Sequence, residues 1–265
     1  MNEVGVNMFV TTSGRTNGEK INEAKEIAQS FNVQYIARRK DSILELQRQQ
    51  DSDCLVVGKN RLELYARREQ QPFFFHPSSG MFRLKRLESG GYDPFIEASG
   101  LKKGKSLLDC TLGLASDSIV ASYAVGAQGL VTGIEGNKVI AYIVSEGLQT
   151  WDCGNESMNQ ALRRVNVMNA LSLSYLQQLP DLSYDCVYFD PMFETTITES
   201  EGIHALRSYA VQEGLTESMM REAMRVAKER VVLKDHFRSS RFEKFPFEVI
   251  KRKSAKFHYG IIKKE

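Results

Sequence analysis

The feature that most constrains the fold is a regular alternation of apolar runs and helix-like segments from residue 92 onward. The short, nearly continuous apolar runs include KSLLDC, GLVTGIE and YDCVYFD, and helical periodicity marks the segments ASDSIVASYAVGA and NKVIAYIVSEGL. Strands that are apolar on both faces are typical of a parallel sheet with helices on both sides. Right-handed crossovers then predict a doubly wound α/β sheet, with its ligand at the carboxyl ends of the strands.

The end of the chain is expected to complete this sheet. RVVLKD predicts one more strand, and FEVIKRKS and KFHYGIIKK predict two final strands that run antiparallel. We therefore predict a Rossmann-like sheet that is mostly parallel and has an antiparallel C-terminal strand.

A smaller α/β pattern occupies the first 75 residues. It predicts strands at NMFVTT and VQYIARR, helices at GEKINEAKEIAQSF and DSILELQRQQ, and a hairpin that turns at Lys59-Asn60. QQPFFFHPSSG follows, and its two prolines mark a break. We expect a small N-terminal α/β domain over residues 1–80 and a larger domain over residues 81–265.

Charge is unevenly distributed although the net charge is only +2. Residues 1–105 hold 17 Lys and Arg against 13 Asp and Glu, and residues 241–265 hold 8 against 3. Residues 106–240 between them hold 10 against 17. Basic flanks favour contact with a polyanion, and they make the N-terminal domain a candidate for RNA contact. Ordinary solvated surface charge is the alternative.

Several classes of protein are not indicated by the sequence. No apolar run approaches the roughly 20 residues of a membrane span, and the N-terminus lacks the pattern of a signal peptide. The four cysteines form no CxxC pair and only four histidines are present, so no metal site is predicted. We expect a cytoplasmic protein with reduced thiols and no metal; the oligomeric state is not predicted.

The loop LLDCTLGLASDS lies where such folds hold a nucleotide. A dinucleotide would require G-x-G-x-x-G, but here only Gly113 is present, with Thr111 and Ala115 at the flanking positions. Asp109 and Asp117 would repel a pyrophosphate. They suit a ligand that carries a cationic amino acid and hydroxyls. S-adenosylmethionine is such a ligand, with an ammonium, a sulfonium and a ribose. A plain turn, in which Asp117 supports the helix dipole, is the alternative.

Glu135 supports the cofactor interpretation. It ends the next predicted strand, 26 residues after Asp109. An acid about 20 residues beyond the loop is where ribose hydroxyls are bound in such folds.

The stretch VYFDPMFE ends a predicted strand with an acid followed by a proline. This stretch resembles a motif of the methyltransferases that act on amino groups, which implies an exocyclic amine on a base as the substrate. Such an amine is a poor nucleophile, and two acceptors can orient its lone pair. Asp190 offers a carboxylate and Pro191 a main-chain carbonyl, which the proline ring helps to hold in place. Phe193 could stack on the base that carries the amine. The alternative is an ordinary turn with Phe193 in the core.

These motifs together resemble the class I S-adenosylmethionine-dependent methyltransferases, with FDPMF in place of their [DN]-P-P-[FYW] motif. More narrowly, the D-x-T-x-G-x-x-x-D loop, VYFDPMF, RVVLK and KFHYGII resemble the small-subunit ribosomal RNA guanine-N2-methyltransferase J family. The resemblance covers roughly residues 80–265. Ala115 stands where the family commonly has Gly, and Asn169 where many members of the class have an acid.

The resemblance implies a set of site residues. The implied catalytic residues are Asp190, Pro191 and Phe193. The implied cofactor-binding residues are Asp109, Thr111, Gly113, Ser116, Asp117, Glu135, Gly136, Leu171, Ser172 and Asp190, with Leu171 and Ser172 on the adenine side.

The resemblance also implies an activity. It is transfer of a methyl group from S-adenosylmethionine to the N2 of a guanine in small-subunit ribosomal RNA, a step of rRNA processing, with that RNA or the small subunit as partner. The alternatives are an N-methyltransferase for DNA adenine, a protein amide or a small molecule, and a non-catalytic RNA-binding module. A nicotinamide oxidoreductase fits the glycine pattern poorly.

Two smaller patterns stay open at this point. Lys234 and His236 follow the strand RVVL and face either the site or solvent. MFRLKR, residues 81–86, interleaves basic and apolar residues and either contacts RNA phosphates or forms ordinary surface.

Overall fold

The computed structural model describes residues 7–67, 69–191, 214–253 and 255–264. The chain divides into two compact units, and the division falls between Phe75 and His76. The two units are described separately. No helix in these residue ranges is long and apolar enough to cross a membrane.

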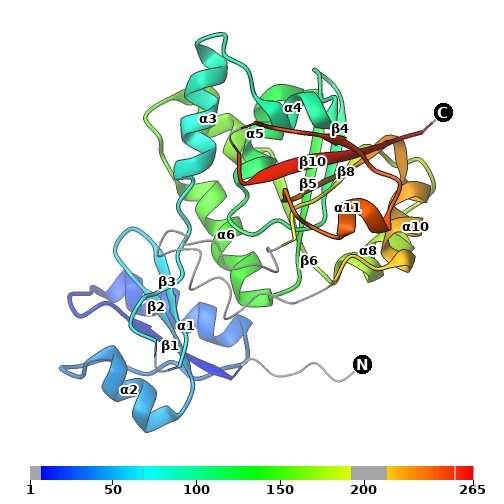
Figure 1. Ribbon diagram of the computed structural model, residues 1–265. Coiled ribbons are helices and arrows are strands. Elements are labelled where there is room, and N and C mark those ends of the chain that lie inside the picture. Colours follow the sequence, from blue (N-terminus) through cyan, green and yellow to red (C-terminus); the bar gives the residue numbers. More distant parts are fainter. Residues whose placement is uncertain (1–6, 68, 192–213, 254, 265) are drawn as a thin grey trace. The chain divides into compact units, whose positions relative to one another are not determined.

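The N-terminal unit is built on a three-stranded sheet (Figure 1). Its elements are β1 (Met8–Thr12), α1 (Gly18–Ser30), α2 (Ile43–Gln50), β2 (Asp53–Val57) and β3 (Leu62–Tyr65). β2 lies between the others, parallel to β1 and antiparallel to β3. The predicted hairpin is therefore confirmed, and its core contains Phe9, Leu46, Cys54 and Val56.

Local sequence explains how α2 begins. Ser42 accepts from the Glu45 main-chain N–H, and the Glu45 carboxylate accepts from that of Ser42, which is a capping box. The strand predicted at VQYIARR is wrong, since only an isolated bridge joins Tyr35 to Val10. Arg39 has a φ of +51° and turns the chain soon after this bridge.

The larger unit contains a seven-stranded sheet in the order β6-β5-β4-β7-β8-β10-β9. The strands are β4 (Ser106–Asp109), β5 (Leu130–Glu135), β6 (Val165–Asn169), β7 (Tyr184–Phe189), β8 (Ala227–His236), β9 (Glu248–Ile250) and β10 (Phe257–Lys263). The first five in the sheet order are parallel, and β10 is antiparallel to both β8 and β9. The predicted fold class is confirmed.

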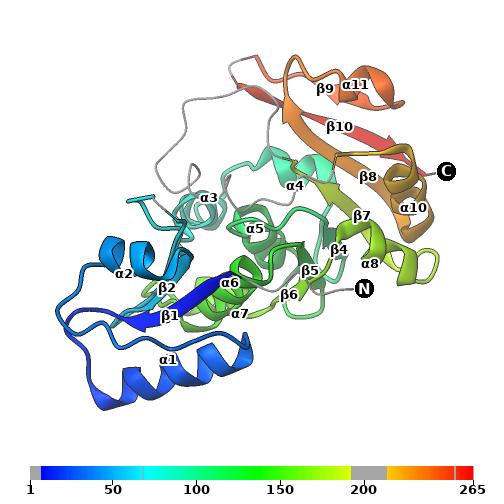
Figure 2. The same ribbon diagram turned by 90° about the horizontal axis from the view of Figure 1, so that it is seen from below.

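Helices cover both faces of this sheet (Figures 1 and 2). They are α3 (Ser78–Glu88), α4 (Pro94–Ser99), α5 (Ser116–Val125), α6 (Lys138–Thr150), α7 (Glu156–Arg163), α8 (Ser172–Gln178), α10 (Glu217–Val226) and the short α11 (Arg241–Lys244). Val187 and Phe189 pack in a core cluster with α8 and α10. Tyr188, on the alternate face of the same strand, packs on Phe95 of α4 with ring centroids 4.7 Å apart.

Candidate active site

The site is the edge of the sheet at which the parallel strands β4, β5, β7 and β8 end. Asp109 ends β4, and in the sheet register it pairs with Tyr188, two residues before Asp190. Glu135 ends the neighbouring β5. The expectation that these three acids meet at one edge follows from the parallel order and is confirmed.

Asp109 is an internal anchor of the loop between β4 and α5. It is 2% exposed, and its Oδ1 accepts from the main-chain N–H and Oγ1 of Thr111 at 3.0 and 3.3 Å. Its Oδ2 accepts from Ser118 Oγ at 2.7 Å. Burial raises the pKa of Asp109 to about 7, although these donors oppose the shift. The side chain thus fixes the loop from inside.

The loop reaches α5 through two residues in the left-handed region, Gly113 at φ +50° and Ala115 at φ +60°. The N-cap residue of α5 is Ala115, whose side chain makes no capping hydrogen bond to the first turn. Main-chain N–H groups at a helix start bind anions such as a carboxylate. The loop also lies close against β5, since a Cβ on Gly133 would stand 2.3 Å from Leu112 Cδ1.

Glu135 lies half-buried at the end of β5. One carboxylate oxygen, Oε1, accepts from the main-chain N–H of Asn137 at 2.8 Å. Burial raises the pKa of Glu135, and main-chain N–H groups, first that of Asn137, oppose the rise. Asn169 donates to the carbonyls of Glu135 and Gly136 at 2.9 and 3.2 Å. The Asn169 amide therefore stabilises the turn after β5. Many members of the class that the sequence resembles have an acid at this position.

The predicted adenine-side residues lie at the start of α8. Leu171 is 45% exposed and offers an apolar surface. Ser172 is buried, and its hydroxyl donates to the carbonyl of Cys110 at 2.7 Å, so it ties α8 to the end of β4. The cofactor role of both residues stays a prediction.

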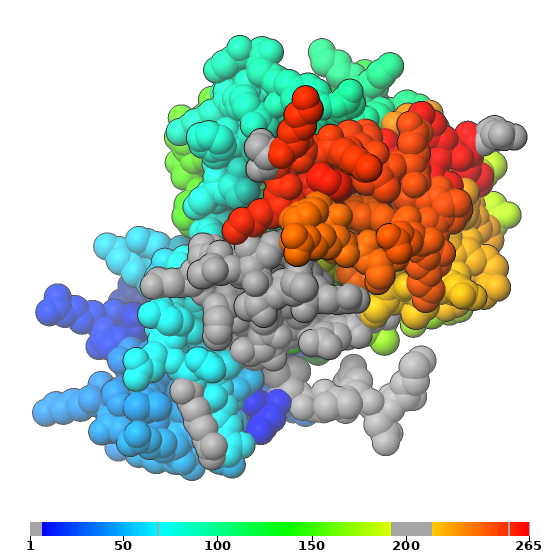
Figure 3. All heavy atoms as spheres, viewed as in Figure 1, coloured from blue at the N-terminus to red at the C-terminus, as the bar shows by residue number. Residues whose placement is uncertain are grey.

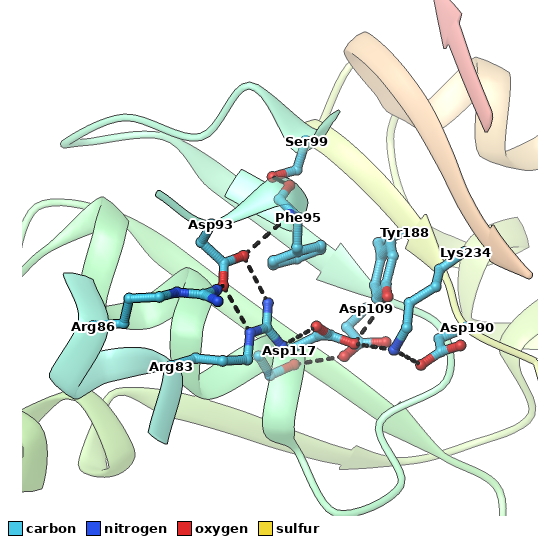
Figure 4. Close-up of polar contacts among 11 residues, drawn as sticks. Arg83, Arg86, Asp93, Phe95, Ser99, Asp109, Asp117, Tyr188, Asp190 and Lys234 are labelled. Carbon is cyan, nitrogen blue, oxygen red and sulfur yellow. Dashed lines mark hydrogen bonds and ion pairs between the residues drawn. The ribbon is translucent and has the colours of Figure 1, made fainter. Parts of the chain in front are cut away.

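Asp117 is held by groups of the protein itself (Figure 4). Arg83 Nη1 donates to its Oδ1 at 2.5 Å, and Tyr188 Oη and Lys234 Nζ donate to its Oδ2 at 2.9 and 3.1 Å. Burial acts to raise the pKa of this carboxyl, but Lys234 and Arg83 outweigh it and hold the pKa well below its usual range. Asp117 is therefore ionised and already balanced by two cations.

Arg83 extends this network away from the sheet. Its Nε and Nη2 donate to the two oxygens of Asp93 at 2.8 and 2.9 Å, a bidentate contact. Arg86 donates to the same carboxylate at 2.8 Å. Both arginines of MFRLKR are thus paired with Asp93. Arg83 also contacts Asp117, so its guanidinium binds groups of the protein and does not face an RNA phosphate.

Asp190 is fixed through both its main chain and its side chain. Its main-chain N–H donates to Thr111 Oγ1 at 2.6 Å, and its Oδ2 accepts from Lys234 Nζ at 2.5 Å. Burial and the nearby Asp117 carboxylate raise the pKa of Asp190 to about 6, against the opposing charge of Lys234. Pro191 follows directly, and Phe193 lies outside the described residues.

Three partners of these acids come from the structure: Lys234, whose position the sequence left open, and Arg83 and Tyr188, which no sequence pattern placed at the site. Lys234 faces the site rather than solvent, because its Nζ contacts Asp190. The ring of His236 instead lies 4.5 Å from the ring of Phe237. Arg83 and Tyr188 lie 34 and 71 positions from Asp117, so no local spacing could have joined them. The one available signal was the alternation in VYFD, which places Tyr188 and Asp190 on the same face of the strand.

The chemistry of this edge fits S-adenosylmethionine. Asp117 already accepts from Arg83 and Lys234, and Asp190 Oδ2 accepts from Lys234. The carboxylate oxygens left for a ligand are therefore those of Glu135, suited to ribose hydroxyls, and the second oxygen of Asp190. The uncapped start of α5 suits the cofactor's carboxylate. In the described ranges, no group of three or more His, Cys, Asp or Glu could hold a metal ion.

Comparison with known proteins agrees with this geometry. A family model described as "Putative SAM-dependent methyltransferase" matches residues 38–259. The chain is 46% identical over 254 residues to "Uncharacterized protein YpiP" of Bacillus subtilis (strain 168), covering 96% of this chain and 98% of that protein. It is 30% identical over 200 residues to "Ribosomal RNA small subunit methyltransferase J" of Tolumonas auensis, covering 72% and 78%.

A solved structure shows the same fold. It is that of the SAM-dependent methyltransferase NGO1261 from Neisseria gonorrhoeae, with a TM-score of 0.61 and 15% identity. The match covers 96% of this chain and 95% of that one.

Proposed function

This chain belongs to the family of S-adenosylmethionine-dependent methyltransferases, and from that premise we propose that it methylates the N2 amino group of a guanine in small-subunit ribosomal RNA. The observation that carries the proposal is the position of Asp190, held by Thr111 of the cofactor loop and by Lys234. The RNA substrate is supported by the relatives whose name is ribosomal RNA small subunit methyltransferase J.

S-adenosylmethionine, when bound, supplies an electrophilic methyl group on a sulfonium. The residues proposed to hold it are the loop from Asp109 to Asp117, Glu135 with Gly136, and Leu171 with Ser172. Among them Asp109 and Asp117 act by fixing the loop and the first turn of α5, since their oxygens already accept from protein groups.

Asp190 and Pro191 are proposed to orient the target amine. The amine has two N–H groups, and its lone pair is delocalised into the base. The Asp190 carboxylate and the Pro191 carbonyl accept these N–H groups, so the lone pair is directed at the methyl group. Orientation of this kind can supply about 7–11 kcal/mol of a barrier. Phe193 is proposed to stack on the base.

Lys234 keeps this acceptor in the required state. Its charge opposes the rise in the pKa of Asp190, so the carboxylate is ionised at neutral pH. After transfer the amine must lose a proton, and Asp190, with a pKa of about 6, can accept it and pass it to water.

We also propose separate roles for the two domains. Residues 81–265 are proposed to perform the transfer, and residues 1–80 to contact the RNA. The cytoplasmic location expected from the sequence stays a prediction that depends on a ribosomal substrate.

An in vitro transfer assay tests this proposal. The protein is incubated with methyl-labelled S-adenosylmethionine and either small ribosomal subunits or their purified RNA. The RNA is then digested to nucleosides, and the labelled nucleoside is identified by mass spectrometry. The proposal predicts label in N2-methylguanosine. Label in adenine, in ribosomal protein or in no ribosomal component would contradict it.

A further inference from the structure

A basic pocket lies on the same sheet edge as the site but on the other side of β8 from the cofactor loop. It has a volume of about 330 Å³ and is lined by Phe237, Lys251, Arg252, Lys253, Ala255 and His258. β8 ends at His236, which pairs with Phe257 at the start of β10. Since β8 is parallel to β7, the pocket lies at the edge where Asp190 lies.

The lining combines positive charge with an exposed aromatic ring. Residues 251–256 contain four Lys or Arg and no acid. Phe237 is 43% exposed, so part of its ring is accessible to a ligand. Figure 3 shows the orange-to-red atoms that include this part of the chain together on one face. Cations beside a ring are typical of surfaces that bind single-stranded nucleic acid.

Arg252 is held in place but has an unused donor. Its main-chain N–H donates to His258 Nδ1 at 3.2 Å, and its guanidinium carbon lies 4.6 Å from the ring centroid of Phe257. Its Nη1 is buried and has no hydrogen-bond partner in the part of the chain that the structure describes. A phosphate in the pocket would supply acceptors that the protein does not.

Phe257 connects the pocket with the active site. Lys234 Nζ lies 5.0 Å from the centroid of this ring, so the ring contacts both Lys234 and Arg252. Lys234 in turn contacts Asp190. The contacts therefore run from Arg252 of the pocket through the Phe257 ring and Lys234 to Asp190.

We infer that this pocket binds a nucleotide that flanks the target in a single-stranded RNA segment, with Lys251, Arg252 and Lys253 on its phosphates and Phe237 against its base. The inference rests on the proposed function and adds to it the surface that positions the RNA. Phosphate contacts position a nucleic acid without reading its sequence, so the pocket contributes affinity and register.

Binding of a 12-nucleotide single-stranded RNA, followed by fluorescence anisotropy at several salt concentrations, tests the pocket. Lys251→Ala/Lys253→Ala should flatten the dependence of log affinity on log salt by about 1.4, since each lost phosphate contact on a single strand contributes about 0.7. Phe237→Ala should weaken binding about tenfold through lost stacking. The matched control is Lys102→Ala/Lys103→Ala, two exposed lysines before β4 at the opposite edge, which should stay within about twofold of wild type.

Each variant is also titrated with S-adenosylmethionine by calorimetry, which verifies that the catalytic unit is folded. RNA binding by the pocket variants equal to that of wild type would overturn the pocket and leave the proposed function standing. Failure of wild type itself to bind the RNA would also overturn the pocket. The proposed function is judged separately, by whether wild type forms N2-methylguanosine.

Discussion

Lys234 Nζ lies 2.5 Å from Asp190 Oδ2 and 3.1 Å from Asp117 Oδ2, so one ammonium joins the end of β7 to the first turn of α5. Its side chain is 16% exposed. Asp117 and Asp190 are therefore paired with a cation of the protein before any ligand binds. The loop, helix α5 and the end of β7 are held as a unit, which is the arrangement that a reaction dependent on orientation requires.

Asp190→Asn should lower the rate of methyl transfer by about 10²-fold or more, while the affinity for S-adenosylmethionine changes much less. Asparagine keeps the size of the side chain but loses the charge that pairs with Lys234 and the acceptor that takes the proton. The measurement is single-turnover methyl transfer together with calorimetric cofactor binding. Asp181→Asn, an exposed acid before β7, is the control, and wild-type activity in Asp190→Asn would contradict the mechanism.

The pH dependence of kcat/KM should report Asp190. A carboxyl with a pKa of about 6 is protonated below that pH, so activity should fall as the pH drops through 6. Lys234 lowers this pKa, so Lys234→Met should move the rising limb of the profile to higher pH. Initial rates at constant ionic strength between pH 5 and 9 provide the measurement.

A purely structural role for Lys234 predicts a different result. In that case Lys234→Met would reduce activity equally at every pH, and the rising limb would not move. Lys234→Arg keeps the positive charge and should restore the position of the limb even where the rate remains low.

Arg83→Met and Arg86→Met form a matched pair because both arginines contact Asp93. Arg83 is mostly buried and also pairs with Asp117, so its loss leaves a buried charge short of a partner and should lower the free energy of unfolding by about 3 kcal/mol. The Arg86 side chain is 42% exposed, so its loss should cost less than about 1 kcal/mol. Urea denaturation measures both, and equal losses would contradict the assigned network.

The parts of the fold that local chemistry determines could be predicted from the sequence. The apolar runs KSLLDC, GLVTGIE and YDCVYFD contain the parallel strands β4, β5 and β7, and the two segments with helical periodicity contain α5 and most of α6. Helix α3 was not predicted, because its first three residues belong to the segment in which prolines suggested a break. The segment expected to form a strand at residues 33–39 pairs with β1 only at the bridge between Tyr35 and Val10. The left-handed conformation of Arg39 then turns the chain.

The sequence predicted which acidic residues lie at the site, but not the residues that form hydrogen bonds with them. Asp109, Glu135 and Asp190 each end a strand or follow its end directly, and parallel strands bring such positions together. The partners of Asp117 come from α3, β7 and β8, and only the packing of the whole unit places them beside it. The proposed stacking residue Phe193 lies outside the described residues and remains a prediction.

Nucleoside mass spectrometry of small-subunit ribosomal RNA, from cells with and without this gene, tests the central claim most directly. Loss of the gene should remove one N2-methylguanosine per RNA molecule. Wild-type protein supplied from a plasmid should restore it, and the Asp190→Asn variant should not. An unchanged content of N2-methylguanosine in cells that lack the gene would contradict the claim.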